Sequence, residues 1–162
     1  MSSALADAAT QLGISLSAEA TAHLLSYLAL IAKWNKIYNL TAVRDPNEMM
    51  THHLLDSLAV IASLTKRMAS GTLLDVGSGA GLPGVVIAIC CPEIHVTCVD
   101  AVAKKATFIK QVALELKLPN LVGLHSRIET IAQPFDVVCS RAFASLVDFT
   151  QGSTNALSPT GL

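Results

Sequence analysis

The stretch "LLDVGSGAGLPG", residues 73 to 84, decides the fold of this chain. An apolar run ends in Asp75, and four glycines then follow within eight residues. Glycine adopts positive φ angles easily and leaves no side chain between the backbone and a ligand. In an open α/β sheet, ligands bind beyond the carboxyl ends of the strands, where such a loop meets a helix N-terminus. The stretch therefore predicts a strand, a ligand-binding loop, and a helix that begins near Pro83.

The spacing of these glycines distinguishes two classes of ligand. The dinucleotide fingerprint GxGxxG requires glycine at position 82, where this chain has leucine. The observed pattern is GxGxG after Asp75, and an acid at the strand tip suits the cationic S-adenosylmethionine better than an anionic pyrophosphate. A tight turn without a ligand is the alternative, although three alternating glycines exceed what a turn needs. The candidate donor-binding residues of this loop are Gly77, Ser78, Gly79, Gly81 and Leu82.

Downstream of the loop, short apolar runs alternate with helical segments. The runs are continuous, which is typical of parallel strands covered on both faces; they span residues 72–76, 96–100, 121–125 and 136–140. Helical patterns lie between them, and a further helix is expected around 146–157. This order predicts a doubly wound, Rossmann-like α/β sheet with strand order 3-2-1-4. Asp100 ends the second strand, where it can accept hydrogen bonds from ribose hydroxyls.

Upstream, two helical patterns precede Gly71. The first covers residues 17–40, with Ser17 as its N-cap and an apolar stripe that runs from Leu24 to Tyr38. The second covers about 46–64 and begins after the capping residue Asp45. The change of pattern predicts two parts, an N-terminal helical extension over 1–70 and a Rossmann-like domain over 71–162.

The second of these helices contains two adjacent histidines. Its apolar stripe, formed by Met50, Leu54, Leu58 and Ile61, leaves His53 and Ser57 nearer another face. His52 and His53 are interpreted as ordinary packing residues, because neither an HExxH motif nor a third ligand accompanies them. We therefore predict no metal site.

Composition limits the class of protein. At 162 residues the chain suits one domain, and no apolar stretch reaches the roughly 18 residues that a membrane-spanning helix needs. The first residues lack the basic start of a secretory signal, and the four cysteines lack metal-binding spacing and are interpreted as buried thiols. These features predict a cytoplasmic protein. The net charge of −1 means that any nucleic-acid surface is a local patch.

The residues at the end of the fourth strand limit which methyl acceptors are possible. "SRAFAS", residues 140 to 145, lacks the Asn/Asp-Pro-Pro-aromatic turn common in enzymes that methylate exocyclic amines. Cys139 stands alone, so the chain also lacks the paired cysteines used to methylate a pyrimidine ring carbon. A purine ring nitrogen has an available lone pair and needs no general base, so alignment and desolvation could suffice for catalysis.

Four stretches carry a family resemblance that covers nearly the whole chain. Residues 33–57, 73–84, 108–118 and 135–146 closely resemble the bacterial small-subunit ribosomal RNA methyltransferase family called RsmG or GidB (glucose-inhibited division protein B). The resemblance implies a Rossmann-like fold with an N-terminal helical extension. It also implies methyl transfer from S-adenosylmethionine to N7 of a guanine in 16S ribosomal RNA, either naked or in the assembled subunit. A monomer without a membrane partner is expected.

Family members continue past the final "SPTGL" into three further strands. We therefore expect a C-terminally truncated chain that is weakly active or inactive. Its fourth strand would have an open outer edge, which would leave the chain prone to association.

The resemblance also assigns roles to single residues. Gly77 and Leu82 would contact the donor, Ile128 and Glu129 would flank its adenine, and Arg141 would lie at the donor site near the acceptor as the catalytic residue. Leu82 could instead be a helix core residue, and the pair at 128 and 129 an ordinary helix start. Candidate RNA phosphate contacts are Arg127, Lys104 and Lys105, although a solvated face explains the two lysines equally well.

Two other function classes are weighed against methyl transfer. A nicotinamide-dependent oxidoreductase is disfavoured by Leu82, and competition between adenosylhomocysteine and NAD would separate the two enzymes. A non-catalytic RNA-binding assembly protein on the same fold would lack donor affinity. It would also need a broader basic surface than 11 Lys and Arg against 12 Asp and Glu suggest.

Overall fold

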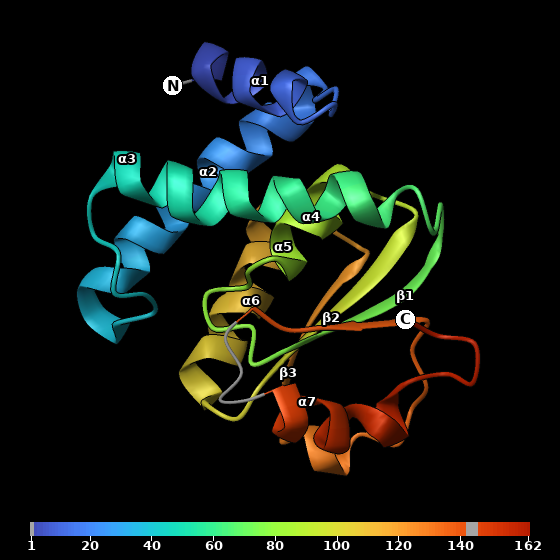
Figure 1. Cartoon of the computed structure of the whole chain (residues 1–162). Helices are drawn as coiled ribbons and strands as arrows, with labels where there is room; N and C mark the ends of the chain where they lie inside the picture. Colours follow the sequence, from blue (N-terminus) through green and yellow to red (C-terminus); the bar gives the residue numbers. More distant parts are fainter. Residues whose placement is uncertain (1, 142–145) are drawn as a thin grey trace.

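The computed structural model describes residues 2–141 and 146–162, and its centre is a parallel sheet (Figure 1). Four strands pair in the order β3-β2-β1-β4. Their bounds are β1 Gly71–Val76, β2 Ile94–Asp100, β3 Leu121–His125 and β4 Val137–Cys139. The predicted Rossmann-like fold and strand order are confirmed.

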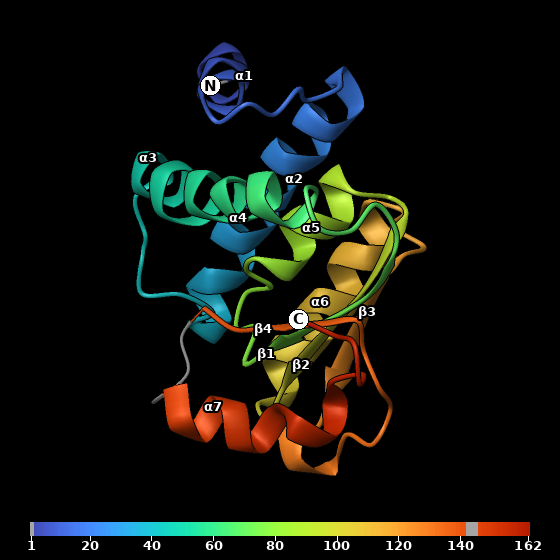
Figure 2. The ribbon, with the colours of Figure 1, turned by 45° about the vertical axis from the view of Figure 1, so that its right-hand side comes forward.

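Helices cover both faces of this sheet. They are α1 Ser2–Gln11, α2 Ala18–Tyr38, α3 Pro46–Met49, α4 Asp56–Leu64, α5 Gly84–Cys90, α6 Ala103–Glu115 and α7 Leu146–Ser153. A π-helical turn, η1 (Met50–Leu55), joins α3 to α4, and two 3₁₀ turns are η2 (Ile128–Thr130) and η3 (Thr154–Ala156). Figures 1 and 2 show α5 and α6 on one face and α7 on the other. Within the described ranges, none of the helices is both long and apolar enough to span a membrane.

Strand β1 contributes to a hydrophobic core on each face. Side chains of consecutive strand residues point to opposite faces, so Leu73 joins the larger cluster, which includes Phe108 of α6, and Leu74 joins a smaller one, which includes Phe135. Burial on both faces explains why the sequence of β1 is continuously apolar, whereas the apolar run of β3 leaves Val122 and Leu124 exposed.

The N-terminal extension shares the larger of these cores. Leu24 and Ile31 of α2 are buried in the same cluster as Val85 of α5 and Phe108 of α6. The boundary near Gly71 therefore marks a change of sequence pattern without a break in the hydrophobic core.

Helix α2 begins as predicted but its apolar stripe ends early. The Ser17 hydroxyl accepts a hydrogen bond from the Ala20 backbone N–H at 3.0 Å, which confirms the N-cap. Ile37 is 73% exposed and Tyr38 38% exposed, so the prediction that they belong to the buried stripe is wrong. Helix α1 was not predicted from the sequence, although Leu5 and Ala9 lie one turn apart and are both buried.

The helical segment predicted over 46–64 is present, but its middle is the π-helical turn. The Asp45 carboxylate caps its start by accepting the backbone N–H groups of Asn47 and Glu48. A π turn holds more residues than an α turn and so shifts the register of the side chains that follow. His53 and Ser57 are buried beside the predicted stripe of Leu54, Leu58 and Ile61, so the buried face is wider than predicted; the interpretation as a packing residue holds for His53 but not for the exposed His52.

The outer edge of β4 carries backbone hydrogen bonds. The Val138 N–H donates to the Leu162 carbonyl at 2.8 Å, and the Leu162 N–H donates to the Asp136 carbonyl at 2.8 Å. Phe135 and Leu157 form a parallel bridge just before them. The expectation of an entirely open edge is wrong, because the last residues of the chain return along this strand.

Candidate functional site

Two adjoining pockets lie at the carboxyl ends of the strands, and Gly77 lines both. The larger pocket is about 340 Å³ and lies over β1, β2 and η2. Its lining includes Gly77, Asp100, Ala101, Arg127, Ile128 and Glu129. The smaller pocket is about 250 Å³ and is lined by residues that include Thr41, Ser78, Gly79, Leu82, Lys105 and Arg141. Together they bring most of the predicted site residues to one edge of the sheet.

The glycine loop between β1 and α5 separates the two pockets. Gly77 and Gly79 have φ angles of 63° and 58°. A Cβ atom at either position would meet nothing within 4 Å, so backbone conformation and not crowding favours glycine at both. The loop consequently exposes bare backbone to both pockets.

Asp100 holds this loop in place. Its Oδ2 accepts the Gly79 N–H at 3.0 Å and its Oδ1 accepts the Val102 N–H at 2.9 Å. Each carboxylate oxygen can accept a second hydrogen bond. Asp100 lines the larger pocket, so it both ties the loops after β1 and β2 together and offers acceptor capacity to a ligand.

Two predicted site residues line neither pocket. Gly81 has a φ angle of 96°, and a Cβ there would lie 2.4 Å from Val85 Cγ2 and 2.5 Å from Ile109 Cδ1. Close packing between α5 and α6 therefore explains this glycine. Lys104 is exposed at the start of α6, whereas its neighbour Lys105 lines the smaller pocket.

The Asp75 carboxyl lies inside the protein and not in the ligand site. It is 0% exposed, its Oδ2 accepts the Gly84 N–H of α5 at 2.8 Å, and its Oδ1 has no hydrogen-bond partner among the described residues. Burial raises the pKa of Asp75 to about 7, against the opposing effects of the Gly84 hydrogen bond and the charge of Arg141. The expectation that this acid faces a cationic ligand is wrong, because its side chain lies beneath the first turn of α5.

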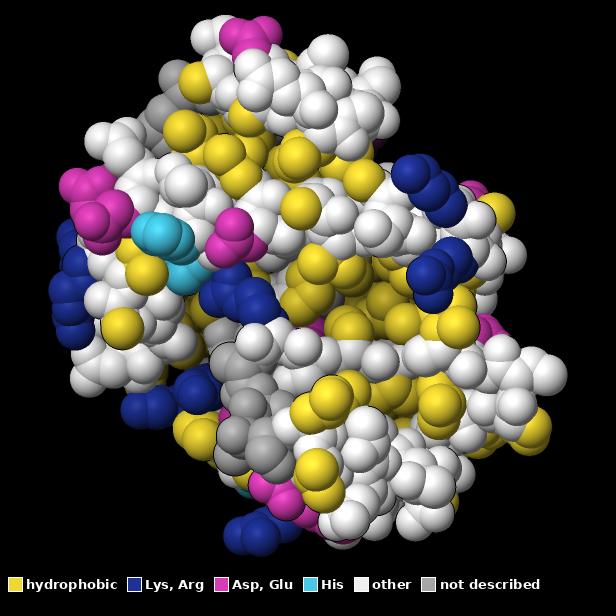
Figure 3. Space-filling model, viewed as in Figure 1, with side chains coloured by type: hydrophobic (Ala, Val, Ile, Leu, Met, Phe, Trp, Pro, Cys, Tyr) yellow, Lys and Arg dark blue, Asp and Glu magenta, His cyan; other side chains and the backbone are white. Residues whose placement is uncertain are grey.

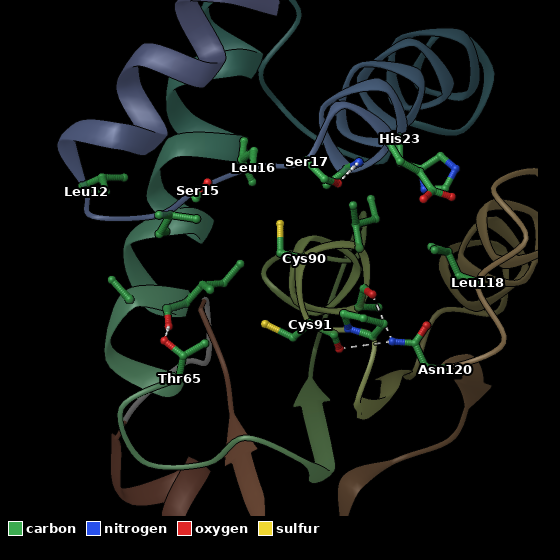
Figure 4. Close-up of a pocket in the computed structure, with 18 of the residues that line it drawn as sticks. Leu12, Ser15, Leu16, Ser17, His23, Thr65, Cys90, Cys91, Leu118 and Asn120 are labelled. Carbon is green, nitrogen blue, oxygen red and sulfur yellow. Dashed lines mark hydrogen bonds between the residues drawn. The ribbon is translucent and has the colours of Figure 1, made fainter.

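A further cavity, of about 730 Å³, lies at the opposite edge of the sheet. Figure 4 shows Cys90, Cys91 and Asn120, which precede β2 and β3, around this cavity together with His23 of α2. Burial raises the pKa of Cys90 to about 12, so its thiol stays protonated and is a poor nucleophile. This cavity lies at the opposite ends of the strands from the glycine loop, and its lining does not include any of the predicted site residues.

Comparison with known proteins identifies the family. The family model GidB, described as rRNA small subunit methyltransferase G, matches residues 20–162. The chain belongs to the GidB family.

Curated relatives agree with this assignment. A Ribosomal RNA small subunit methyltransferase G from Polaromonas naphthalenivorans (strain CJ2) is 62% identical over 157 residues, which is 93% of this chain and 71% of the relative. A protein of the same name from Acidovorax sp. (strain JS42) is 58% identical over 169 residues, covering 98% of this chain and 75% of the relative.

Solved structures support the fold of this GidB chain. A coclaurine N-methyltransferase bound to N-methylheliamine and SAH superposes with a TM-score of 0.57 at 15% identity, over 85% of this chain and 42% of that one. A SAM-dependent methyltransferase from Thiobacillus denitrificans, in complex with S-adenosyl-L-homocysteine, superposes with a TM-score of 0.52 at 20% identity. The match covers 71% of this chain and 51% of that one. The GidB chain thus spans about half of these structures and shares the Rossmann-like methyltransferase fold.

Sequence reasoning missed a residue of the GidB extension that supports the glycine loop. The hydroxyl of Tyr27, in α2, donates to the Ala80 carbonyl at 2.7 Å. The ring is buried and lies 6.5 Å from that of Phe108, centroid to centroid. A tyrosine in a buried helical stripe was the available signal, but its partner is 53 residues away in the sequence.

We expect Tyr27→Phe in this GidB chain to weaken donor binding without unfolding the protein. The change keeps the ring and removes the hydrogen bond to Ala80, which costs about 1 kcal/mol of stability. Affinity for adenosylhomocysteine should fall roughly five- to tenfold because the loop is less well held. Calorimetry beside a thermal melt tests this. Tyr38→Phe on the exposed end of the same helix is the matched control, and equal effects of both changes would contradict the assignment.

Proposed function

We propose that this chain transfers a methyl group from S-adenosylmethionine to N7 of a guanine in small-subunit ribosomal RNA. The observation that carries the proposal is the pair of pockets meeting at Gly77, one suited to an adenosine and the other open to an acceptor base. Family membership supports the ribosomal RNA substrate.

The residues of the larger pocket fit the adenosine part of the donor. Ile128 provides an apolar side chain for the adenine beside Glu129, and Asp100 has acceptor capacity for the ribose hydroxyls. The backbone of Gly77 and Gly79 leaves space for the amino-acid part, since nothing lies where their Cβ atoms would be.

The smaller pocket fits an acceptor that needs no deprotonation. Among its lining residues in the described ranges, none is Asp, Glu or His, so this wall supplies no obvious general base. When bound, S-adenosylmethionine would supply a methyl group on a sulfonium, which the N7 lone pair could take up directly while the S–C electron pair stays on sulfur, so the protein would not have to remove a proton first. The pocket residues have only to align the base and exclude water.

Cationic side chains at the pockets suit an RNA backbone. Lys105 and Arg141 line the smaller pocket and Arg127 lines the larger one. Figure 3 shows lysine and arginine side chains in separate places on one face, without a broad basic surface there. The proposal includes a monomer that acts in the cytoplasm on the RNA or the assembled subunit, and light scattering tests the monomeric state.

We expect Arg141→Ala to reduce methyl transfer by roughly ten- to a hundredfold, because the change removes one charge-assisted hydrogen bond to the acceptor. The side chain is exposed, so the melting temperature should change little. Turnover measured beside a thermal melt tests this, with the exposed Arg67→Ala as control. A large melting loss with a proportionate activity loss would indicate a structural arginine.

The direct test of the function is mass mapping of methylated guanines in small-subunit RNA from cells with and without the gene. We expect one N7-methylguanine to disappear when the gene is removed. An unchanged map would overturn the proposal. Binding of NAD in competition with adenosylhomocysteine would favour an oxidoreductase, and no donor binding would favour an assembly protein.

A further inference from the structure

A threonine from the N-terminal extension forms part of the smaller pocket. Thr41, in the segment between α2 and α3, lines this pocket, which Arg141 also lines. Its Oγ1 lies 3.1 Å from Nε2 of His53 and accepts the Val43 backbone N–H at 3.2 Å. Its own backbone N–H donates to the Oδ1 of the buried Asn35 at 2.9 Å. The Thr41 side chain is therefore held in one place at the pocket wall.

The His53 ring is a neutral partner for this threonine. The ring is 1% exposed, and burial, with a contribution from the charge of Arg141, lowers the pKa of His53. A neutral imidazole carries one N–H and one acceptor nitrogen. Nδ1 is buried and has no hydrogen-bond partner among the described residues. Orphaned buried donors are rarer than orphaned acceptors, so we assign the proton to Nε2, which then donates to Thr41.

This arrangement leaves the Thr41 hydroxyl as a donor. A hydroxyl has two acceptor lone pairs and one O–H. His53 and Val43 occupy the two lone pairs, and the described part of the chain supplies no acceptor for the O–H. The O–H is therefore available to a molecule in the pocket.

Arg141 is held by the same π-helical turn. Its Nη1 donates to the backbone carbonyl of His52 at 2.8 Å, and a guanidinium has further N–H groups to offer. Such turns often occur at functional sites. Adjacent residues of η1, His52 and His53, thus hold two hydrogen-bond donors at one pocket.

We propose that Thr41 and Arg141 donate hydrogen bonds to O6 of the acceptor guanine and that His53 positions Thr41, so that the pocket selects guanine over adenine. The inference rests on the proposed transfer to guanine N7. The N7 lone pair forms the new bond, so N7 is not available to accept a hydrogen bond from the protein. The neighbouring group on C6 must then identify the base: it is the acceptor O6 in guanine and the donor N6 amino group in adenine. An adenine would leave the two protein donors unpaired.

Base analogues in the substrate RNA test this contact. The methylated guanine is replaced by inosine, which keeps N7 and O6, or by 2-aminopurine, which keeps N7 and lacks O6. With the unmodified protein, 2-aminopurine should lower kcat/KM about tenfold or more, and inosine should have little effect.

Protein variants then show whether Thr41 makes the contact. Thr41→Val should lower kcat/KM for the guanine RNA about tenfold, and the further cost of 2-aminopurine should become smaller than in the unmodified protein, because both changes remove the Thr41 hydrogen bond and only the contact from Arg141 is left to lose. Thr41→Ser keeps the hydroxyl, so 2-aminopurine should lower its kcat/KM as much as it does for the unmodified protein. Adenosylhomocysteine affinity should stay within about twofold in both variants.

Two His53 variants test positioning. His53→Gln retains an N–H donor and should retain most of the discrimination against 2-aminopurine, whereas His53→Leu should reduce it as Thr41→Val does. If the leucine variant does not fold, the glutamine variant and the Thr41 pair decide. An unreduced cost of 2-aminopurine in Thr41→Val, or an equal loss of donor affinity, overturns the proposal. Absence of N7-methylguanine in the reaction of the unmodified protein overturns the proposed function itself, which separates the two failures.

Discussion

Asp75→Asn is expected to remove a large pH-dependent loss of stability. In the folded chain the Asp75 carboxyl has a raised pKa of about 7, against 3.8 for an ordinary aspartate. Below the lower value both states are protonated and the folded state keeps its full stability. As the pH rises toward 7, the unfolded chain releases the proton first and stability falls, by roughly 4 kcal/mol in total. Asparagine does not ionise, so the variant should lack this fall.

The geometry favours a neutral group at this position. The amide oxygen of asparagine can accept the Gly84 N–H as Oδ2 does now, whereas its amide N–H groups would replace an oxygen that has no partner among the described residues and would lower the stability by a similar amount at every pH. Denaturant unfolding at pH values from 4 to 8 measures the effect. The difference in unfolding free energy between variant and unmodified chain should grow steadily across this range and level off above pH 7.

Asp7→Asn, on the exposed surface of α1, is the matched control and should give a curve parallel to that of the unmodified chain. Parallel curves for Asp75→Asn would contradict the raised pKa. Since Asp75 lines neither pocket, the ratio of S-adenosylmethionine to adenosylhomocysteine affinity should not change. A selective loss of the cationic donor would instead restore the role that the sequence suggested for this acid.

Asp100→Ala should lower the affinity for adenosylhomocysteine roughly ten- to a hundredfold. Hydrogen bonds to a charged group contribute about 1.5 to 3 kcal/mol each, and the change removes the acceptor at the ribose. It also removes the partner of the Gly79 N–H and so loosens the glycine loop. Isothermal calorimetry measures the affinity, and unchanged binding would contradict the assignment of Asp100 to the donor site.

Asp136→Ala provides a matched control for Asp100. Its carboxylate accepts hydrogen bonds from the backbone N–H and the hydroxyl of Thr72, at 2.8 and 3.0 Å, near the start of β4. Loss of these bonds should lower the melting temperature and leave donor affinity unchanged, because Asp136 lies away from both pockets. A comparable fall in affinity would indicate that Asp100 acts through general stability.

The parallel sheet and the ligand-binding edge could be predicted from local patterns. The apolar run at 72–76 lies within β1, and Ser17 and Asp45 cap the helices they were predicted to cap. A strand buried on both faces needs continuous apolar residues, and a side-chain acceptor stabilises a helix start, so each can be recognised within a few residues of sequence. The glycine loop is recognisable for the same reason.

Side-chain direction and long-range contacts were decided only by the tertiary structure. Asp75 and Asp100 both stand at strand ends, yet the first points beneath α5 and the second lines a pocket. Gly81 belongs to the same glycine pattern as Gly77 but is required by helix packing. The Tyr27 hydroxyl meets a carbonyl 53 residues away, and Arg141 meets one 89 residues away. Such contacts depend on how helices from the extension pack against the sheet, and a pattern within a few residues of sequence does not predict that packing.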